Sequence, residues 1–194
     1  SIIQSTISDK YKRPSMETGF HALLNEYVLH VHPIYLTCLL CLKESSQIVS
    51  ELYHQYDYQY VKYANPGFDL YCVMRPMESH DIYFLENHGV IVSGLDMKYA
   101  FEIVHKLNNI AKEYMISKCQ LPDFDLSFAE AQSFDDYLFP DAVIFADDLS
   151  KREVRAAHNY INIFGTKIGN LRHITCGSVQ LLKGLESEQY RRTL

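Results

Sequence analysis

The feature that most restricts the fold of this chain is a long amphipathic segment that follows two short apolar runs. Residues 81–85 and 90–92 are rich in β-branched and aromatic side chains and flank a turn at residues 86–89. Residues 96–117 then place apolar side chains at helical spacing along one face. This order predicts two strands joined by a turn and followed by the longest helix of the chain. Because strands alternate with helices, the sequence predicts an α/β fold.

The rest of the chain continues this alternation, with no internal repeat. We expect further helices and strands over the following ranges: helices at 17–27, 34–42, 68–77, 150–163 and 178–191, and strands at 28–32, 58–63 and 142–145. Ser150 and Glu153 have the spacing of a capping box at the start of one of these helices. The chain has 194 residues, a length that predicts one domain, or one domain with an appendage. We expect a core domain over residues 1–120 and a loop with helices packed on it over residues 121–194.

Composition excludes several classes of protein. The net charge is −6 and basic residues form no long stripe, so nucleic acid is not an expected partner. No apolar run approaches the roughly 18–20 residues of a membrane span, and no signal peptide is evident. Five cysteines, an odd number, favour a reducing cytoplasm over a disulfide scaffold. Cys38 and Cys41 form a C-x-x-C motif among leucines, which we interpret as buried helix residues, with a redox or zinc role as the weaker alternative.

Three histidines and one glutamate are the residues most able to carry chemistry. His30 and His32 occupy alternate positions of a predicted strand, so they project from the same face and could chelate one divalent metal. Two ordinary surface or core histidines are an equally weighted interpretation. His88 lies in the turn between two strands, and Gly89 after it would allow a close approach of backbone or ligand.

Glu17 lies near the start of a predicted helix, where the helix dipole alone could account for an acidic residue. The alternative is a carboxylate that acts as a base beside a metal. Such a base needs a pKa raised by burial, or a substrate proton made more acidic by the metal.

The order of these motifs resembles one family. The chain contains P-S-x-E-x-x-x-H at residues 14–21, H-x-H-P at residues 30–33 and N-H-G-V-I-V-x-G at residues 87–94. Together they resemble the class II aldolase/adducin family, over roughly residues 12–118. The resemblance implies a three-layer α/β/α fold whose central sheet is mostly antiparallel. The stretches at residues 139–145 and 186–191 resemble some bacterial members more weakly.

The resemblance also implies roles for single residues. His30, His32 and His88 match the ligands of one divalent metal per chain, with zinc expected and manganese, cobalt or iron as alternatives. Glu17 matches the catalytic acid/base. Ser15 matches one serine of a phosphate-binding pair and is expected to bind substrate.

Other positions match less directly. Met16 stands where the family has the second serine of the phosphate-binding pair. Tyr63 and Gly67 match a structural stretch, and we expect His21 to support the site and not to bind the metal. A tyrosine from a neighbouring subunit often donates a proton in this family, and Tyr53 and Tyr56 are among the candidates.

The implied function is that of a metal-dependent aldolase, an aldehyde-lyase that cleaves a small ketose or ketose phosphate through a metal-stabilised enediolate. An epimerase or dehydratase with the same site is the alternative enzyme. A non-catalytic, adducin-like interaction domain or an inactive metal-binding homologue is the alternative outside catalysis. A homo-oligomer is expected, a tetramer by resemblance. The family's usual phosphate-binding segments before the glutamate are not found in this sequence, so we expect either a longer protein or an unphosphorylated substrate.

Overall fold

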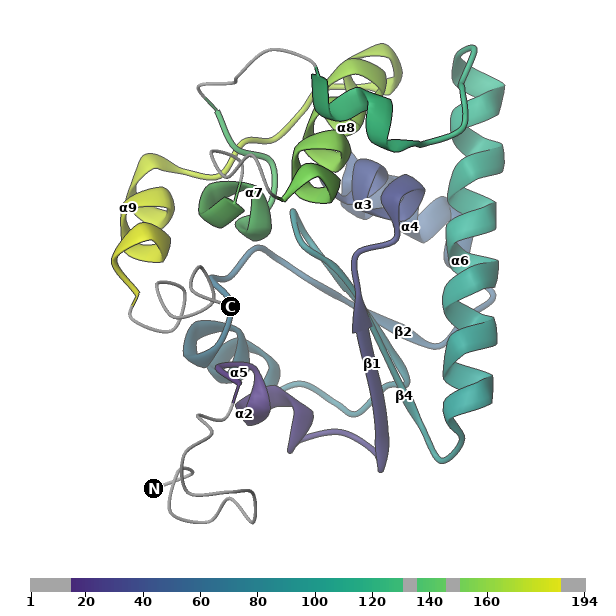
Figure 1. The fold of residues 1–194 in the computed structure, drawn as a ribbon. Helices are drawn as coiled ribbons and strands as arrows, with labels where there is room; N and C mark the ends of the chain where they lie inside the picture. Colours follow the sequence, from purple (N-terminus) through teal and green to yellow (C-terminus); the bar gives the residue numbers. More distant parts are fainter. Residues whose placement is uncertain (1–14, 131–135, 146–150, 186–194) are drawn as a thin grey trace.

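The centre of the computed structural model, which describes residues 15–130, 136–145 and 151–185, is a four-stranded sheet with helices beside it (Figure 1). Its strands lie in the order β1-β4-β3-β2. Their bounds are β1 Tyr27–Val31, β2 Tyr58–Val61, β3 Ile82–Leu85 and β4 Gly89–Gly94. Strand β4 pairs antiparallel with β1 and β3, whereas β2 pairs parallel with β3. The expectation of a mostly antiparallel sheet is therefore met in two of the three pairings.

Helices flank this sheet, so the predicted α/β class is confirmed. Their bounds are α2 Thr18–His21, α3 Ile34–Leu40, α4 Ser45–Tyr53, α5 Phe68–Met74, α6 Met97–Lys118, α7 Pro140–Phe145, α8 Arg152–Ile168 and α9 Cys176–Gly184, with a 3₁₀ turn at Leu126–Glu130. In the part of the chain described, no helix combines the length and apolarity that crossing a bilayer would require.

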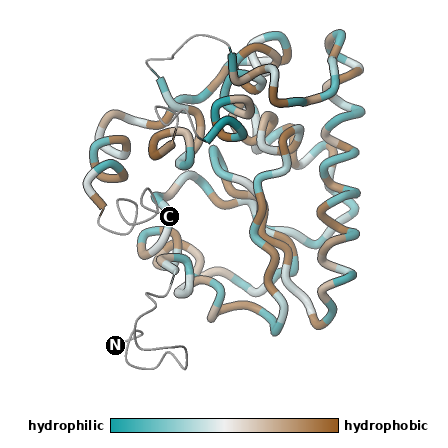
Figure 2. Tube along the Cα trace, viewed as in Figure 1, coloured by the Kyte–Doolittle hydropathy of each residue, from teal (hydrophilic) through white to brown (hydrophobic). Residues whose placement is uncertain are grey.

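Helix α6 is the predicted long amphipathic helix. The carboxylate of Asp96 accepts a hydrogen bond from the Lys98 backbone N–H and caps the first turn. Hydrophobic and hydrophilic residues alternate around the helix axis (Figure 2). The buried side, which includes Ile103, Leu107 and Ala111, packs on β1, β4 and α3. The helix predicted over residues 96–117 from the spacing of apolar residues is thus confirmed, with bounds that differ by one residue.

The strands contribute side chains to two separate hydrophobic clusters. Ile82 and Phe84 of β3 belong to the main cluster, which includes residues of α3, α4 and α6. Tyr83 and Leu85 alternate with them and belong to a second cluster with residues of α2 and α5. Because the side chains of a strand point alternately to opposite faces, β3 is buried on both faces.

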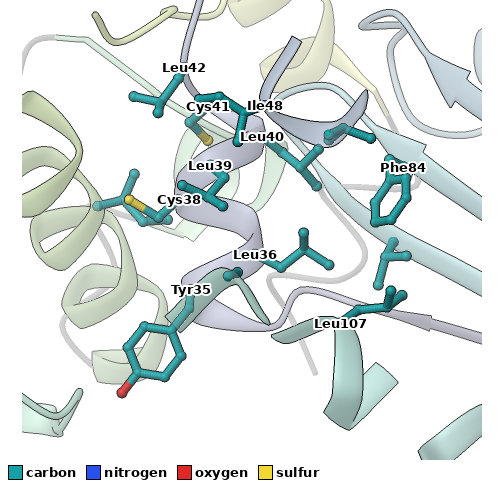
Figure 3. Packing of buried hydrophobic residues seen from close by; sticks show 14 of the residues in the cluster. Tyr35, Leu36, Cys38, Leu39, Leu40, Cys41, Leu42, Ile48, Phe84 and Leu107 are labelled. Atoms are coloured by element: carbon teal, nitrogen blue, oxygen red, sulfur yellow. The ribbon is translucent and has the colours of Figure 1, made fainter. Parts of the chain in front are cut away.

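Helix α3 passes through the main cluster, and the C-x-x-C motif lies at its end, with Cys38 inside the helix and Cys41 as its C-cap (Figure 3). Cys38 and Cys41 are buried among leucines, and both thiols are free. Burial raises the pKa of both thiols, which keeps them protonated and unreactive. Their interpretation as buried helix residues is confirmed.

One predicted strand is wrong. Residues 142–145 lie in helix α7, which begins at Pro140 with Asp141 in its first turn. Proline is well suited to a first helical position, and an acidic residue there interacts favourably with the helix dipole. Four apolar residues are too few to distinguish a helical period from a strand period, so Pro140 and Asp141 were the informative residues.

Several predicted boundaries also differ. Of the helix expected over residues 17–27, only α2 forms, because the chain turns before entering β1. Helix α4 was not predicted. Helix α8 begins after Lys151 and extends to Ile168, while the expected cap Ser150 is outside the described residues. Helix α9 begins after Thr175, whose side chain accepts a hydrogen bond from the Ser178 N–H. The expected continuation of α9 over residues 186–191 is likewise outside the described residues.

The segment after residue 120 contributes to the same core. Leu138, Tyr160 and Phe164 belong to the main cluster with residues of α3 and α6. Leu42 forms a β-bridge with Leu171. The division of the chain at residue 120 remains a prediction.

Candidate metal centre

Two neighbouring strands bring three histidines together. His30 lies in β1, His32 follows that strand directly, and His88 directly precedes β4. The pairing of Val31 with Val90 aligns these ends. The ring centroids are 4.8 to 5.0 Å apart, and one ring nitrogen of each histidine lies within 4.8 Å of the other two. The predicted histidines therefore form one cluster.

Gly89 makes this close approach possible. A Cβ at this position would lie 2.5 Å from Cδ2 of His32 and 2.5 Å from the carbonyl oxygen of Val31. No larger residue fits there without displacing the His32 ring or the backbone of β1. Gly89 therefore allows a close approach, as expected, and the groups that approach it are the backbone of β1 and the His32 ring.

Glu17 completes the cluster from a different part of the chain. Its Oε2 lies 3.2 Å from Nδ1 of His30, and its Oε1 lies 4.0 Å from Nε2 of His88. Burial alone would raise the pKa of Glu17. The hydrogen bond with His30 and the charges of His30, His32 and His21 outweigh that effect and lower the pKa below its ordinary value. Glu17 is therefore a carboxylate at neutral pH. Of the two ways in which such a base can act, this favours a substrate proton made more acidic by a metal over a glutamate whose own pKa is raised.

The residues present fit a divalent metal. Nε2 of His30 is buried and has no hydrogen-bond partner among the described residues. A buried polar atom without a partner is costly, and a metal ion would satisfy it. Three imidazoles with a nearby carboxylate are a donor set suited to zinc and its neighbours in the first transition series.

Asp141 is a site residue that the sequence did not reveal. Its Oδ2 lies 3.3 Å from Nδ1 of His32, so it can fix the orientation of that ring. Asp141 stands in the first turn of α7, the segment predicted as a strand. The pair Pro140-Asp141 was the feature of the sequence that could have indicated a helix beginning here.

Ser15 lies next to Glu17 in the turn before α2. Its Oγ accepts a hydrogen bond from the Glu17 N–H at 3.2 Å, and the side chain is exposed. Met16 packs against Gly67, where φ is +89° and a Cβ would lie 2.9 Å from the methionine Cε. A substrate-binding role for Ser15 remains a prediction.

The other residues singled out from the sequence are near the centre or in the core. His21 lies close to Glu17 and His30, and its ring stacks on Phe20. Burial lowers the pKa of His21. The Tyr53 hydroxyl donates a hydrogen bond to the Leu107 carbonyl in the core of its own chain. Because Tyr53 is buried and its hydroxyl is engaged in this bond, the structure does not favour it as a proton donor to the site of another subunit.

Comparisons with known proteins agree with the order of the motifs. A family model described as the class II aldolase and adducin N-terminal domain matches residues 2–115. A curated relative, the uncharacterized oxidoreductase YuxG of Bacillus subtilis (strain 168), is 26% identical over 114 residues. This alignment covers 56% of the chain and 16% of YuxG, so the chain spans only about a sixth of that relative's length.

Proposed function

The chain belongs to the class II aldolase and adducin family, and on that premise we propose that it is a divalent-metal-dependent aldolase. The proposed reaction is cleavage of a carbon–carbon bond in a small ketose or ketose phosphate. The observation that carries the proposal is the cluster of His30, His32 and His88, with the Glu17 carboxylate 3.2 Å from Nδ1 of His30.

The three histidines would hold the metal, which would polarise the oxygen atoms of the substrate as a Lewis acid. Glu17 is ionised at neutral pH and would accept the proton of the substrate hydroxyl. The bond between the hydroxyl-bearing carbon and its neighbour then breaks and releases an aldehyde. Return of the proton to the remaining carbon gives the ketone fragment. Zinc is the proposed metal, and a homo-oligomer is the proposed assembly.

Family membership is also compatible with functions other than that of an aldolase. An epimerase or dehydratase would share the metal and Glu17 but release no aldehyde. A scaffold without catalysis would need no metal centre, and the presence of all three histidines with Glu17 argues against it. The name of YuxG suggests an oxidoreductase, but that name describes a much longer protein.

The first experiment is to measure the metal content of the purified chain by elemental mass spectrometry. We expect about one divalent ion per chain, and its loss in the double variant His30→Ala/His32→Ala. The matched control is His54→Ala/His105→Ala, which removes two exposed histidines and should retain the metal. A metal-free native chain that takes up no zinc would contradict the proposal.

The second experiment identifies the products formed from a panel of ketoses and ketose phosphates. Release of an aldehyde would support the aldolase, whereas an epimer or a dehydrated product would favour the alternatives. Glu17→Gln should retain the metal and lose activity by about 10²- to 10⁴-fold, the usual contribution of a general base.

A further inference from the structure

A cavity of about 360 Å³ opens beside the proposed metal centre. This volume is within the range of small-molecule binding sites. His32 lines the cavity and is the most exposed of the three histidines. The cavity therefore adjoins the centre on the side of His32.

The walls of the cavity are mostly apolar. They are formed by side chains of α3, α8, the segment before the 3₁₀ turn and the residue directly before α7: Ile34, Phe124, Phe139, Val154, Ala157 and Ile161. Helices α7 and α8 lie in the part of the chain outside residues 2–115. The cavity is therefore lined in part by residues outside the region that the family model matches.

Besides His32 and Thr37, the polar side chains that line the cavity are acidic and therefore unfavourable for an anion. Asp141 and Glu153 both line it, and none of the described lining residues is lysine or arginine. Away from the metal centre, a phosphate or carboxylate group would face these two carboxylates with no lysine or arginine side chain of the lining to pair with it. An uncharged apolar group, in contrast, would gain from leaving water.

We propose that this cavity binds the non-reacting end of the substrate and selects an uncharged, apolar group there. The inference rests on the proposed function, because it needs a metal centre to hold the reacting end. It adds the substrate class: a hydroxyketone whose fragment on the His32 side carries an alkyl or aryl group in place of a phosphate.

The test uses hydroxamates, which chelate divalent metals through two oxygens and can carry different tails. Three probes are titrated into the Co²⁺-loaded chain and followed by the visible absorption of the metal. They are acetohydroxamate, hexanohydroxamate and 3-phosphonopropanohydroxamate. Each buried methylene contributes roughly fourfold to affinity, so hexanohydroxamate should bind at least about tenfold more tightly than acetohydroxamate. The phosphonate probe should show no such gain.

Ala157→Leu fills the cavity from α8 and gives the matched comparison. It should reduce the gain in affinity of hexanohydroxamate over acetohydroxamate to less than about threefold. Asn162→Leu adds the same side chain at an exposed position of the same helix and should preserve the full gain. Thermal unfolding of both variants checks that they are folded.

The outcomes separate the two proposals. Binding of acetohydroxamate without any gain from the alkyl tail, or with a larger gain from the phosphonate tail, would overturn the substrate class alone. An alkyl gain that Ala157→Leu leaves intact would place the tail elsewhere and overturn the assignment to this cavity. Failure of every hydroxamate to change the Co²⁺ spectrum would refute the metal centre, and the inference that depends on it would fall as well.

Discussion

Gly89 is the single residue on which the spacing of the three histidines depends most directly. Gly89→Ala would place a methyl group 2.5 Å from the Val31 carbonyl oxygen and from the His32 ring. We expect a loss of about 2 kcal/mol in unfolding free energy, as for other overpacked sites, and at least a tenfold loss of zinc affinity. Chemical denaturation and a zinc titration measure the two effects.

Gly177 provides the control for this variant. It lies in α9, and a Cβ there would have no neighbour within 4 Å. Gly177→Ala should leave zinc affinity unchanged and stabilise the fold by up to about 1 kcal/mol, because alanine is a better helix former. If Gly89→Ala behaved like Gly177→Ala, the close approach at β1 would be unnecessary for the centre.

Asp141 should act through His32. Because its carboxylate lies 3.3 Å from Nδ1 of His32, Asp141→Asn should weaken orientation of the ring and lower zinc affinity about 10- to 100-fold. Isothermal titration with zinc measures this change independently of activity. Asp123→Asn is the control, since Asp123 is exposed and pairs with Lys112. Equal zinc affinity in the two variants would show that the Asp141 contact does not support the centre.

Among the elements, α8 carries a buried histidine that should make stability depend on pH. Burial lowers the pKa of His158 from 6.5 to about 3, despite a hydrogen bond with the backbone of Asp136. The unfolded chain therefore binds a proton below pH 6.5 that the folded chain does not bind until about pH 3. Stability should be lost as the pH falls through this window, by about 2 kcal/mol between pH 7.5 and pH 5.

This contribution is measured by urea denaturation at the two pH values. His158→Leu removes the titrating group, so its stability should fall less between them than that of the native chain. The difference between the two pH dependences isolates His158 from the carboxylates. Identical pH dependences would mean that His158 is protonated equally in the folded and unfolded chains.

The elements also show what could be predicted from the sequence. Helix α6 has strong helical periodicity, and the strands β3 and β4 are short apolar runs rich in β-branched and aromatic residues, so each was placed correctly. Helix α7 has only a few apolar residues, so period alone could not separate it from a strand. Of the candidate site, the three histidines and Glu17 were found from motif spacing and resemblance. Asp141 and the apolar cavity were not, because they depend on how α8 packs against α3 and α7 and on how α7 brings Asp141 to His32. The three-layer arrangement and the oligomeric state remain predictions.

At the scale of the whole molecule, Asn87 connects the sheet to the last third of the described chain. Its Nδ2 donates hydrogen bonds to the carbonyl oxygens of Leu138 and Arg172, and its backbone has φ of +54°. Nearby, Nε of Arg172 lies 3.5 Å from the carboxylate of Glu86. Asn87 therefore holds two distant segments beside His88.

Two substitutions of Asn87 separate the contribution of its side-chain hydrogen bonds from the contribution of its positive φ. Asn87→Gly loses both side-chain hydrogen bonds but adopts the positive φ freely, so it should cost about 2 kcal/mol of unfolding free energy. Asn87→Ala should cost about 1 kcal/mol more, because its Cβ disfavours this conformation. Chemical denaturation of both variants gives these values. A cost below 0.5 kcal/mol for Asn87→Gly, the size of an ordinary surface substitution, would contradict the connecting role.

The strand order also sets a sequence of events during synthesis on the ribosome. In the sheet described, β1 pairs with β4 and with no other strand, and β4 ends at Gly94. His30 and His32 therefore emerge from the exit tunnel well before the strand that aligns them with His88, and Asp141 emerges later still. A nascent chain can assemble the histidine cluster only after β4 has emerged and can orient His32 only after α7 has followed. If the chain binds a metal as proposed, it would therefore capture the ion late in synthesis, after most of the described core residues have emerged.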